Sequence, residues 1–230
     1  MGIRSDGMTL VLLLVLASLA QSQQKLLDYD ARVLPANASP AWTHHGGRAV
    51  EAIIDGRWVV RDVRDFSRRV RLADVEARYE GQVHELTFQW SSTAHDTLAA
   101  DGLSVQYAGR RFRLFPVRLP NGRSVLLTGT SKGCLLSEPS CHVKLPEGLQ
   151  FDAGTLNQYR VRWTTNRAND YGFEVWVNRT RIGILPGETL FGNGVALSME
   201  FRAGRHVVDD VRWTVLDQGI RLVDARTRHA

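Results

Sequence analysis

Lysine is nearly absent from this sequence of 230 residues, which contains only Lys25, Lys132 and Lys144. All the other basic residues are arginines, and the net charge at pH 7 is +5. Arginine suits planar, bidentate partners such as carboxylate or phosphate, although a genome that favours arginine codons produces the same composition. No basic block with interleaved aromatic residues and no zinc-ligand spacing occurs, so we expect no nucleic acid partner.

Cysteine is equally scarce, with Cys134 and Cys141 as the only two. An even pair in an oxidising compartment usually forms a disulfide, and we predict that these two join and pin a loop tip. The only long apolar run, residues 8–19, follows Arg4 and precedes small residues. It is too short to span a bilayer comfortably and is typical of a signal peptide. We therefore expect residues 1–22 to be removed and the protein to be secreted, periplasmic or extracellular.

Helical periodicity is also nearly missing, whereas alternation of apolar and polar residues recurs along the whole chain. The stretch "VHELTFQW" places His84, Leu86, Phe88 and Trp90 on one face of a strand, and residues 67–80 are interpreted as another strand. The dipeptides Asp55-Gly56 and Asn121-Gly122 are strong turn signals. The chain is long enough for one core. We predict a single all-β domain over residues 26–220, an antiparallel β-sandwich of about 10–13 short strands, and a flexible tail at 221–230.

The order of four segments resembles a known family. These segments are "LDYDARVLPANASPAWTHHGG", "VEAIIDGRWVVRD", "YRVRWTTNRANDYGFEVWVNRTRIG" and "GVALSMEFRAGRHVVDDVRWTVLDQG". They are similar to the laminin-G-like, or concanavalin A-like lectin/glucanase, jelly-roll domains of secreted bacterial proteins. Residues 175–178 stand in the place of the family's "v-y-v-d" strand, and Arg179 stands where the pattern has glycine. The resemblance implies two stacked antiparallel sheets, with carbohydrate bound by many members on the concave face or the loop rim.

A tryptophan on the polar side of a strand is the main functional signal. Trp176 alternates with the core-facing Phe173, Val175 and Val177. Sugars have apolar faces and hydroxyl rims, which suit an aromatic ring beside amide, carboxylate and guanidinium groups. The predicted ligand-binding residues are therefore Trp176, Arg160, Arg162, Glu174, Glu85, Gln89 and Gln106. The alternative is an ordinary solvated face, with Arg162 stacked on Trp176 and Glu174 paired with Arg160.

Catalytic signals are weaker. Retaining glycosidases need two carboxylates close together, and the family's E-x-D-x-x-E run does not occur. Gln82-Val83-His84 matches a Gln-(Ile/Val)-His element of some alginate lyases of the same jelly-roll class, in which a His removes a proton and Gln and Arg neutralise the substrate carboxylate. The alternative is that His84 is an ordinary core histidine. We expect a secreted, non-catalytic module that binds carbohydrate or another extracellular polymer, and an enzyme less readily than a binding module.

Two other functions stay open, namely a polysaccharide lyase or divergent glycoside hydrolase, and a structural module of the cell envelope. We expect no cofactor apart from a structural calcium ion. Calcium takes several oxygen ligands, which Asp28, Asp30, Asp209 and Asp210, or Asp96 and Asp101, could supply. The expected partner is a polysaccharide or glycan, including an anionic one, with no stable membrane span after signal cleavage.

Overall fold

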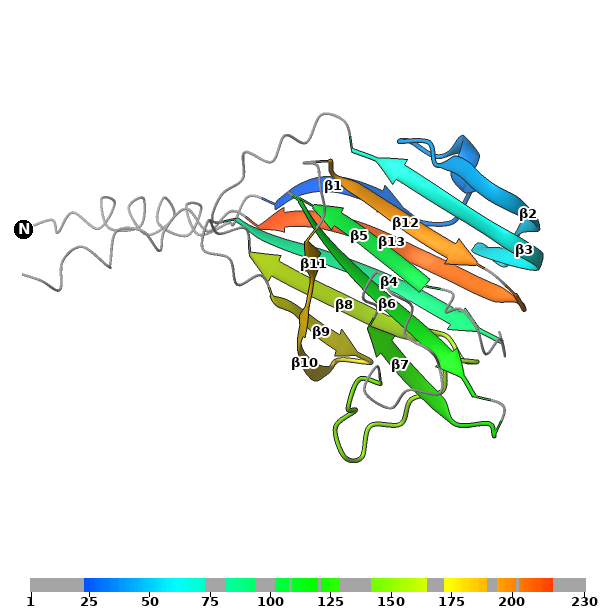
Figure 1. Cartoon of the computed structure of the whole chain (residues 1–230). Helices are drawn as coiled ribbons and strands as arrows, with labels where there is room; N and C mark the ends of the chain where they lie inside the picture. Colours follow the sequence, from blue (N-terminus) through cyan, green and yellow to red (C-terminus); the bar gives the residue numbers. More distant parts are fainter. Residues whose placement is uncertain are drawn as a thin grey trace, which may run out of the picture.

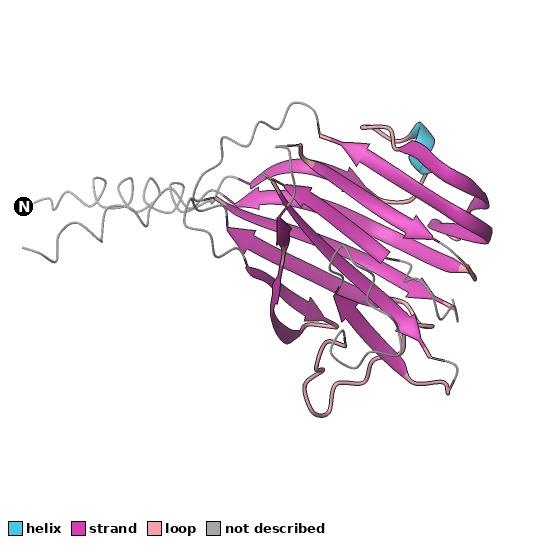
Figure 2. Cartoon of the chain, viewed as in Figure 1, coloured by secondary structure: helices cyan, strands magenta, loops and turns pink. Residues whose placement is uncertain are grey.

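The protein is described by a computed structural model that covers residues 23–72, 82–93, 102–107, 109–119, 121–128, 142–164, 172–189, 194–201 and 203–216. Within these ranges the chain consists almost entirely of strands, and the one helical element is the short 3-10 turn η1 (Pro35–Asn37) (Figure 2). The strands are β1 (Gln23–Tyr29), β2 (Thr43–Ile54), β3 (Arg57–Arg71), β4 (Val83–Ser92), β5 (Gly102–Tyr107), β6 (Arg110–Arg118), β7 (Ser124–Thr128), β8 (Asn157–Thr164), β9 (Gly172–Val177), β10 (Thr180–Pro186), β11 (Glu188–Thr189), β12 (Ala196–Phe201) and β13 (His206–Leu216).

Hydrogen bonds join all thirteen strands into one antiparallel sheet (Figure 1). Its order is β10-β9-β8-β4-β13-β3-β12-β5-β6-β11, and β1, β2 and β7 are attached to β13, β3 and β6 respectively. β13 and β3 are joined by only three residue pairs, His206–Val208 with Trp58–Val60. Beyond them β3 pairs with β12 instead, over residues 66–71. β3 therefore connects two halves of the sheet.

The sheet curls so far that its two ends meet. The ring of Phe112 on β6 stacks on that of Phe173 on β9, with centroids 4.7 Å apart, although these strands lie near opposite ends of the strand order. β10 ends at Pro186 and β11 begins at Glu188, so Gly187 alone separates the first strand of the order from the last. A Cβ atom at Gly187 would lie 2.6 Å from the Phe173 ring, which explains glycine at this junction. The fold is nearly barrel-like.

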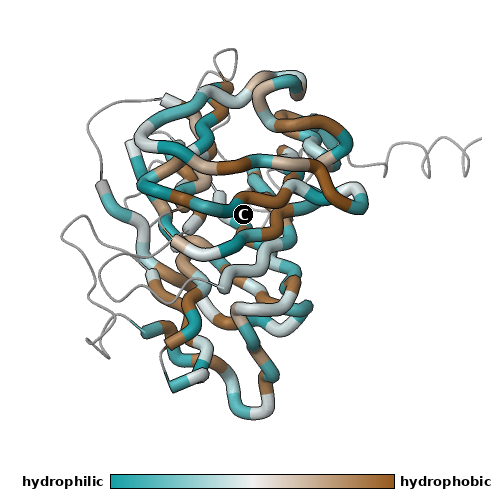
Figure 3. The backbone as a smooth tube through the Cα atoms, turned by 90° about the vertical axis from the view of Figure 1, so that its right-hand side faces the viewer, coloured by the Kyte–Doolittle hydropathy of each residue, from teal (hydrophilic) through white to brown (hydrophobic). Residues whose placement is uncertain are grey.

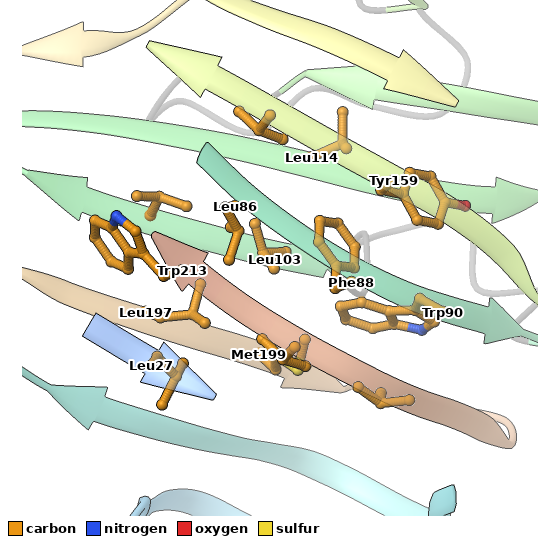
Figure 4. Close-up of a cluster of buried hydrophobic side chains, with 14 of the residues drawn as sticks. Leu27, Leu86, Phe88, Trp90, Leu103, Leu114, Tyr159, Leu197, Met199 and Trp213 are labelled. Atoms are coloured by element: carbon orange, nitrogen blue, oxygen red, sulfur yellow. The ribbon is translucent and has the colours of Figure 1, made fainter. Parts of the chain in front are cut away.

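One large hydrophobic core fills the interior. Apolar and polar segments alternate along the strands (Figure 3), because successive side chains of a strand point to opposite faces. The inward side chains of β4, β5, β8, β12 and β13 meet between the two halves of the sheet (Figure 4). The core includes the fully buried Trp58, Trp90, Trp213, Phe88 and Phe201. A second, smaller cluster on β6 and β7 contains Phe115 and Leu127.

Several predictions made from the sequence are confirmed. The fold is all-β and antiparallel, and His84, Leu86, Phe88 and Trp90 all point into the core. Asp55 and Gly56 form the two-residue β2–β3 turn, with φ angles of 52° and 69°. At the predicted Asn121-Gly122 turn, the Gly122 amide donates to the Leu119 carbonyl oxygen at 2.9 Å. Because the strands form one continuous sheet, the division into two stacked jelly-roll sheets stays a prediction.

Candidate functional site

The polar side of β4, β8 and β9 carries most of the predicted ligand-binding residues. These strands are neighbours, and their register aligns the outward side chains in rows. One row contains Glu85, Arg162 and Glu174, and the next contains Thr87, Arg160 and Trp176. Gln89 lies in a third row, opposite Gln158. The structure thus brings six of the seven predicted residues together, and we call this surface the Trp176 face.

Trp176 is half-buried because an arginine covers its ring. The Arg160 Cζ atom lies 3.9 Å from the ring centroid, while the Arg162 Cζ atom lies farther away, at 5.6 Å. Arg162 instead donates to Glu85, with an Nη2–Oε2 distance of 2.7 Å. Glu174 pairs with Arg181 of β10 at 2.5 Å. The alternative interpretation, an ordinary solvated face, paired Glu174 with Arg160 and stacked Arg162 on Trp176. The structure instead pairs Glu174 with Arg181 and places Arg160 closest to the Trp176 ring.

A hollow of about 440 Å³ lies beside Trp176. It is lined by Glu85, Thr87, Gln158, Arg160, Trp176 and Arg179. Two of these residues, Arg160 and Arg179, form no ion pair with any residue that the structure describes. Stacking on Trp176 uses the flat face of the Arg160 guanidinium and leaves its N–H edge available as a donor. The hollow therefore combines an aromatic edge, the uncharged polar groups of Thr87 and Gln158, the Glu85 carboxylate that pairs with Arg162, and two arginines without a described ion-pair partner.

Arg179 occupies an unusual backbone conformation for its residue type. Asn178 and Arg179 form the two-residue turn between β9 and β10, with φ angles of 48° and 69°. Two consecutive left-handed residues are typical of a type I′ turn, in which glycine is preferred at the second position. Asn178 is anchored there, because its side-chain Oδ1 atom accepts a hydrogen bond from the backbone N–H of Gln158 at 3.0 Å. Arg179 has no such role in the turn, and its side chain lines the hollow. Unfavourable conformations of this kind cluster at functional sites.

An Arg179→Gly substitution is expected to stabilise the fold and weaken ligand binding at the same time. Relief of the left-handed conformation should raise the free energy of unfolding by about 0.5–1 kcal/mol, or the melting temperature by roughly 1–4 °C. Thermal unfolding and a binding titration measure the two effects. Asp55→Gly, at a left-handed position in the β2–β3 turn, is the matched control and should leave binding unchanged. A destabilised Arg179→Gly variant would contradict this account of the turn.

Gln106, the seventh predicted residue, lies on the other side of the molecule. On β5 the neighbouring Tyr107 points into the core and contacts His84 of β4, with ring centroids 4.4 Å apart. Gln106 must therefore point away from β4, while Glu85, next to His84, points away from β5. Gln106 does not belong to the Trp176 face. The sequence shows which residues alternate outward, but not which of the outer surfaces each one reaches.

Gln106 belongs instead to a group of arginines that the sequence analysis missed. The Arg69 Nη2 atom donates to the Gln106 Oε1 atom at 3.0 Å. Burial, and then the nearby Arg71 charge, lower the pKa of Arg69. Arg113 lies next to Ser104 in the register, and Arg111 lies next to Gln106 and pairs with Glu188 at 2.6 Å. We call Arg69, Arg71, Gln106 and Arg113 the Gln106 face. The richness in arginine was the only signal of this group in the sequence.

No catalytic residue was predicted, and the lyase alternative would use Gln82 and His84. His84 is fully buried against the rings of Tyr107 and Trp163, so no polymer on the surface reaches it. Its Nδ1 atom accepts from the Trp213 Nε1 atom at 3.2 Å. Burial lowers the pKa of His84 to about 4. His84 is thus a core histidine, which was the alternative interpretation of this motif.

The carboxylates considered for calcium are occupied by basic side chains. Asp28 pairs with Lys25 at 2.6 Å, Asp30 with Arg32 at 2.9 Å, and Asp210 with Arg212 at 2.6 Å. Asp209 lies 3.7 Å from Arg57. In the described part of the chain, no three His, Cys, Asp or Glu residues gather in a way that could hold a metal ion. Asp96 and Asp101 lie outside the described residues.

Four further predictions also lie outside the described residues. They are the signal peptide at 1–22, the Cys134–Cys141 disulfide, the second half of the strand expected over 67–80, and the tail at 221–230. The first half of that strand is confirmed, since β3 extends to Arg71. No helix in the described ranges has the length and apolar character needed to cross a membrane.

The sequence matches no protein-family model, and no curated protein is similar to it. Solved structures are similar in fold. A variant of the alginate lyase Aly36B, in complex with alginate trisaccharide, has a TM-score of 0.55 and 10% identity over 84% of this chain and 98% of that chain. The fold is similar to that of an alginate lyase. Domain 4 of AbnA, an extracellular arabinanase of Geobacillus stearothermophilus, in complex with arabinotriose, has a TM-score of 0.50 and 10% identity over 86% of this chain and 96% of that chain.

These similarities correct one expectation. The sequence favoured a non-catalytic module over an enzyme, because the hydrolase motif of the family is absent. The solved structures that resemble this chain include alginate lyases, so this preference for a binding module over an enzyme is contradicted. At a sequence identity of 10%, these similarities show the fold alone. The roles of the site residues are therefore inferred from their geometry in this structure. The fold is one that carbohydrate-binding and carbohydrate-processing proteins use.

Proposed function

We propose that the protein binds an acidic polysaccharide on the Trp176 face. The observation that carries this proposal is the hollow of about 440 Å³ that joins Trp176 to Arg160 and Arg179. A sugar ring offers apolar C–H groups to an indole and hydroxyl groups to amide, hydroxyl and carboxylate side chains. Gln158, Thr87 and Glu85 supply those polar groups in the same hollow.

Arg160 is proposed to receive the acid group of the sugar. Its stacking on Trp176, at 3.9 Å, fixes the guanidinium before the ligand arrives, and a preorganised group loses less entropy on binding. A stacked guanidinium can still donate two parallel hydrogen bonds to a carboxylate from its edge. The other charged residues of the face, Arg162 with Glu85 and Arg181 with Glu174, are already paired. This difference supports Arg160 and Arg179 as the residues that select an anionic ligand.

A Trp176→Ala substitution tests the proposal. The probes are uronate oligosaccharides from alginate and polygalacturonate, with neutral cello-oligosaccharides for comparison, in a glycan array followed by calorimetry. We expect uronate affinity to fall about tenfold or more, because the variant loses apolar contact area and the support of Arg160. Ile184→Ala on β10 is the control, since Ile184 is 64% exposed but does not line the hollow. Unchanged affinity in the Trp176 variant would refute the proposed site.

A second candidate function is the eliminative cleavage of an acidic polysaccharide, for which the Gln106 face would bind and neutralise the sugar carboxylate. The observation that favours it is the Arg69–Gln106 hydrogen bond of 3.0 Å beside Arg71 and Arg113. Arg71 is exposed and Arg113 is half-buried. Their guanidinium groups could donate bidentate hydrogen bonds to a uronate carboxylate.

Incubation with alginate and with polygalacturonate separates this second function from simple binding. An eliminative cleavage forms an unsaturated sugar, whose ultraviolet absorbance rises with time. We expect a Gln106→Ala variant to lose this rise and a Gln89→Ala variant on the Trp176 face to keep it. No rise with either polymer, or equal rates in both variants, would exclude elimination at the Gln106 face.

A further inference from the structure

A cleft of about 730 Å³ lies away from both polar faces, where β3 changes its pairing partner. It is formed by β2, by the middle of β3 and by residues 203–205, which connect β12 to β13. Four arginines line it, namely Arg48, Arg61, Arg64 and Arg205. We call it the corner cleft.

A β-bulge brings these arginines together. In the β2–β3 register Arg48 pairs with Arg64 and Val50 pairs with Arg61, so β3 has one residue more than β2 between the two pairs. Asp62, which lies in the bulged segment, has a left-handed backbone conformation with φ of 54°. A bulge bends a strand and increases its twist, and here it lies between the segment of β3 that pairs with β13 and the segment that pairs with β12.

Glycine lets β2 follow this bend. A Cβ atom at Gly47 would lie 1.9 Å from the Arg64 carbonyl oxygen, so any other residue there would push the two strands apart. The preceding Gly46 has φ of 85°. The corner is therefore encoded by the sequence around the arginines and is a built feature of the fold.

The charge of the corner cleft is not balanced by the residues that the structure describes. The lining contains one carboxylate, Asp62, against four guanidinium groups. None of the four forms an ion pair or a side-chain hydrogen bond with a described residue, unlike Arg68, Arg111 and Arg162, which all pair with glutamates. Like charges in one cleft repel each other and create a positive potential that attracts anions.

We propose that the corner cleft binds the acid groups of an anionic polysaccharide, as a second site independent of the Trp176 face. Arginine forms bidentate hydrogen bonds with carboxylate and sulfate groups. Between the arginines lie apolar groups, including Val50, which is 44% exposed, and these suit the C–H faces of sugar rings. Among the described residues the lining has no aromatic ring, whereas proteins that bind single-stranded nucleic acid stack bases on aromatic side chains. The lining therefore favours a polysaccharide.

Affinity electrophoresis and calorimetry with three polyanions test this proposal. The probes are alginate for carboxylate, dextran sulfate for sulfate, and poly(dT) for nucleic acid, with neutral dextran as the uncharged polymer. An Arg61→Gln/Arg64→Gln variant should bind alginate or dextran sulfate at least about tenfold more weakly, because two charge-assisted contacts are lost. The matched control, Arg32→Gln/Arg123→Gln, removes the same charge from exposed positions outside the cleft and should change affinity less than about twofold.

Three outcomes would overturn the corner site. They are equal weakening in both double variants, no weakening in the Arg61/Arg64 variant, and tighter binding of poly(dT) than of either polysaccharide. The measurements are repeated in a Trp176→Ala background. The corner site predicts that the Arg61/Arg64 effect persists there. Its loss in that background, with Trp176→Ala alone abolishing all binding, would leave the Trp176 face as the one polysaccharide site.

Discussion

Acidification from pH 6.5 to pH 4 is expected to lower the free energy of unfolding steeply, by on the order of 3 kcal/mol for each of two buried histidines. Burial lowers the pKa of both His84 and His206 to about 4. The unfolded chain takes up protons near the ordinary histidine pKa of about 6.5, whereas the folded chain keeps both rings neutral until about pH 4. The contribution to stability is therefore complete above pH 6.5 and is lost as the pH falls through this window.

The geometry around the two histidines explains why the charged form is excluded. Each joins β4 to β13 through an indole: Trp213 donates to the Nδ1 atom of His84 at 3.2 Å, and Trp90 donates to the Nδ1 atom of His206 at 3.4 Å. The Nε2 atom of His206 lies 2.7 Å from the Ala203 carbonyl oxygen and donates to it. A protonated imidazole carries hydrogens on both nitrogens. Protonation would therefore bring the Nδ1–H group of each histidine into contact with the indole N–H group that now donates to that nitrogen.

Urea unfolding followed by tryptophan fluorescence at a series of pH values measures this effect. His206→Gln is expected to reduce the pH dependence by about half, because a glutamine amide can accept from Trp90 and donate to Ala203 without titrating in this range. His45→Gln, at an exposed position on β2, should leave the curve unchanged. The raised pKa of Asp209, which is due mainly to burial, acts in the opposite direction at the acidic end. A flat curve between pH 6.5 and pH 4 would refute the assignment of neutral core histidines.

An Arg68→Met substitution is expected to lower the free energy of unfolding by about 3–5 kcal/mol, because it leaves a buried carboxylate without its cation. Arg68 and Glu51 form an ion pair whose side chains are only 12% and 10% exposed. The Arg68 Nε atom donates to the Glu51 Oε1 atom at 3.1 Å, and Trp58 donates to the same oxygen at 3.1 Å. The Arg68 Nη1 atom also donates to the Trp42 backbone carbonyl oxygen at 3.5 Å, and the Arg68 Cζ atom lies 5.3 Å from the centroid of the Phe66 ring.

A double-mutant cycle separates the loss of the pair from the loss of packing. The Glu51→Leu/Arg68→Met variant removes both charges, and replacing a buried pair by apolar residues is often neutral or stabilising. We expect this double variant to be several kcal/mol more stable than Arg68→Met alone. Chemical denaturation gives the free energy of unfolding of the unsubstituted protein, of Glu51→Leu, of Arg68→Met and of the double variant. Equal stabilities of the single and double variants would show that the pair contributes nothing beyond its bulk.

Local patterns in the sequence predict local structure well in this protein. Alternation in "VHELTFQW" correctly gave the buried side of β4, and Asp55-Gly56 correctly gave the β2–β3 turn. The outward position of Trp176 also followed from alternation within β9. Each of these features depends on a few consecutive residues, so the strand period of two and the turn preferences of glycine and asparagine are sufficient.

Features that depend on the closure of the sheet were not predictable in this way. Gln106 alternates outward just as Gln89 does, yet the curl of the sheet places the two on opposite sides of the core. The partners of the arginines depend on register between strands far apart in sequence, such as Glu85 with Arg162 and Glu51 with Arg68. Of the two interpretations of His84, the core histidine is correct and the lyase residue is not. The sequence did not decide between them, because the neighbours Tyr107 and Trp213 come from distant strands.

The junction at Gly187 also affects whether the two ends of the strand order can pair with another chain. A sheet normally ends in strands whose free N–H and C=O groups can recruit another chain. Here the two ends of the order are β10 and β11. β10 contains a register shift between Arg181 and Gly183 and ends at Pro186, and β11 has only two residues. Bulges, prolines and very short strands all hinder edge-to-edge association. The two ends of this strand order are therefore poor templates for a second molecule, whereas β2 pairs only with β3 and keeps an open edge among the described strands.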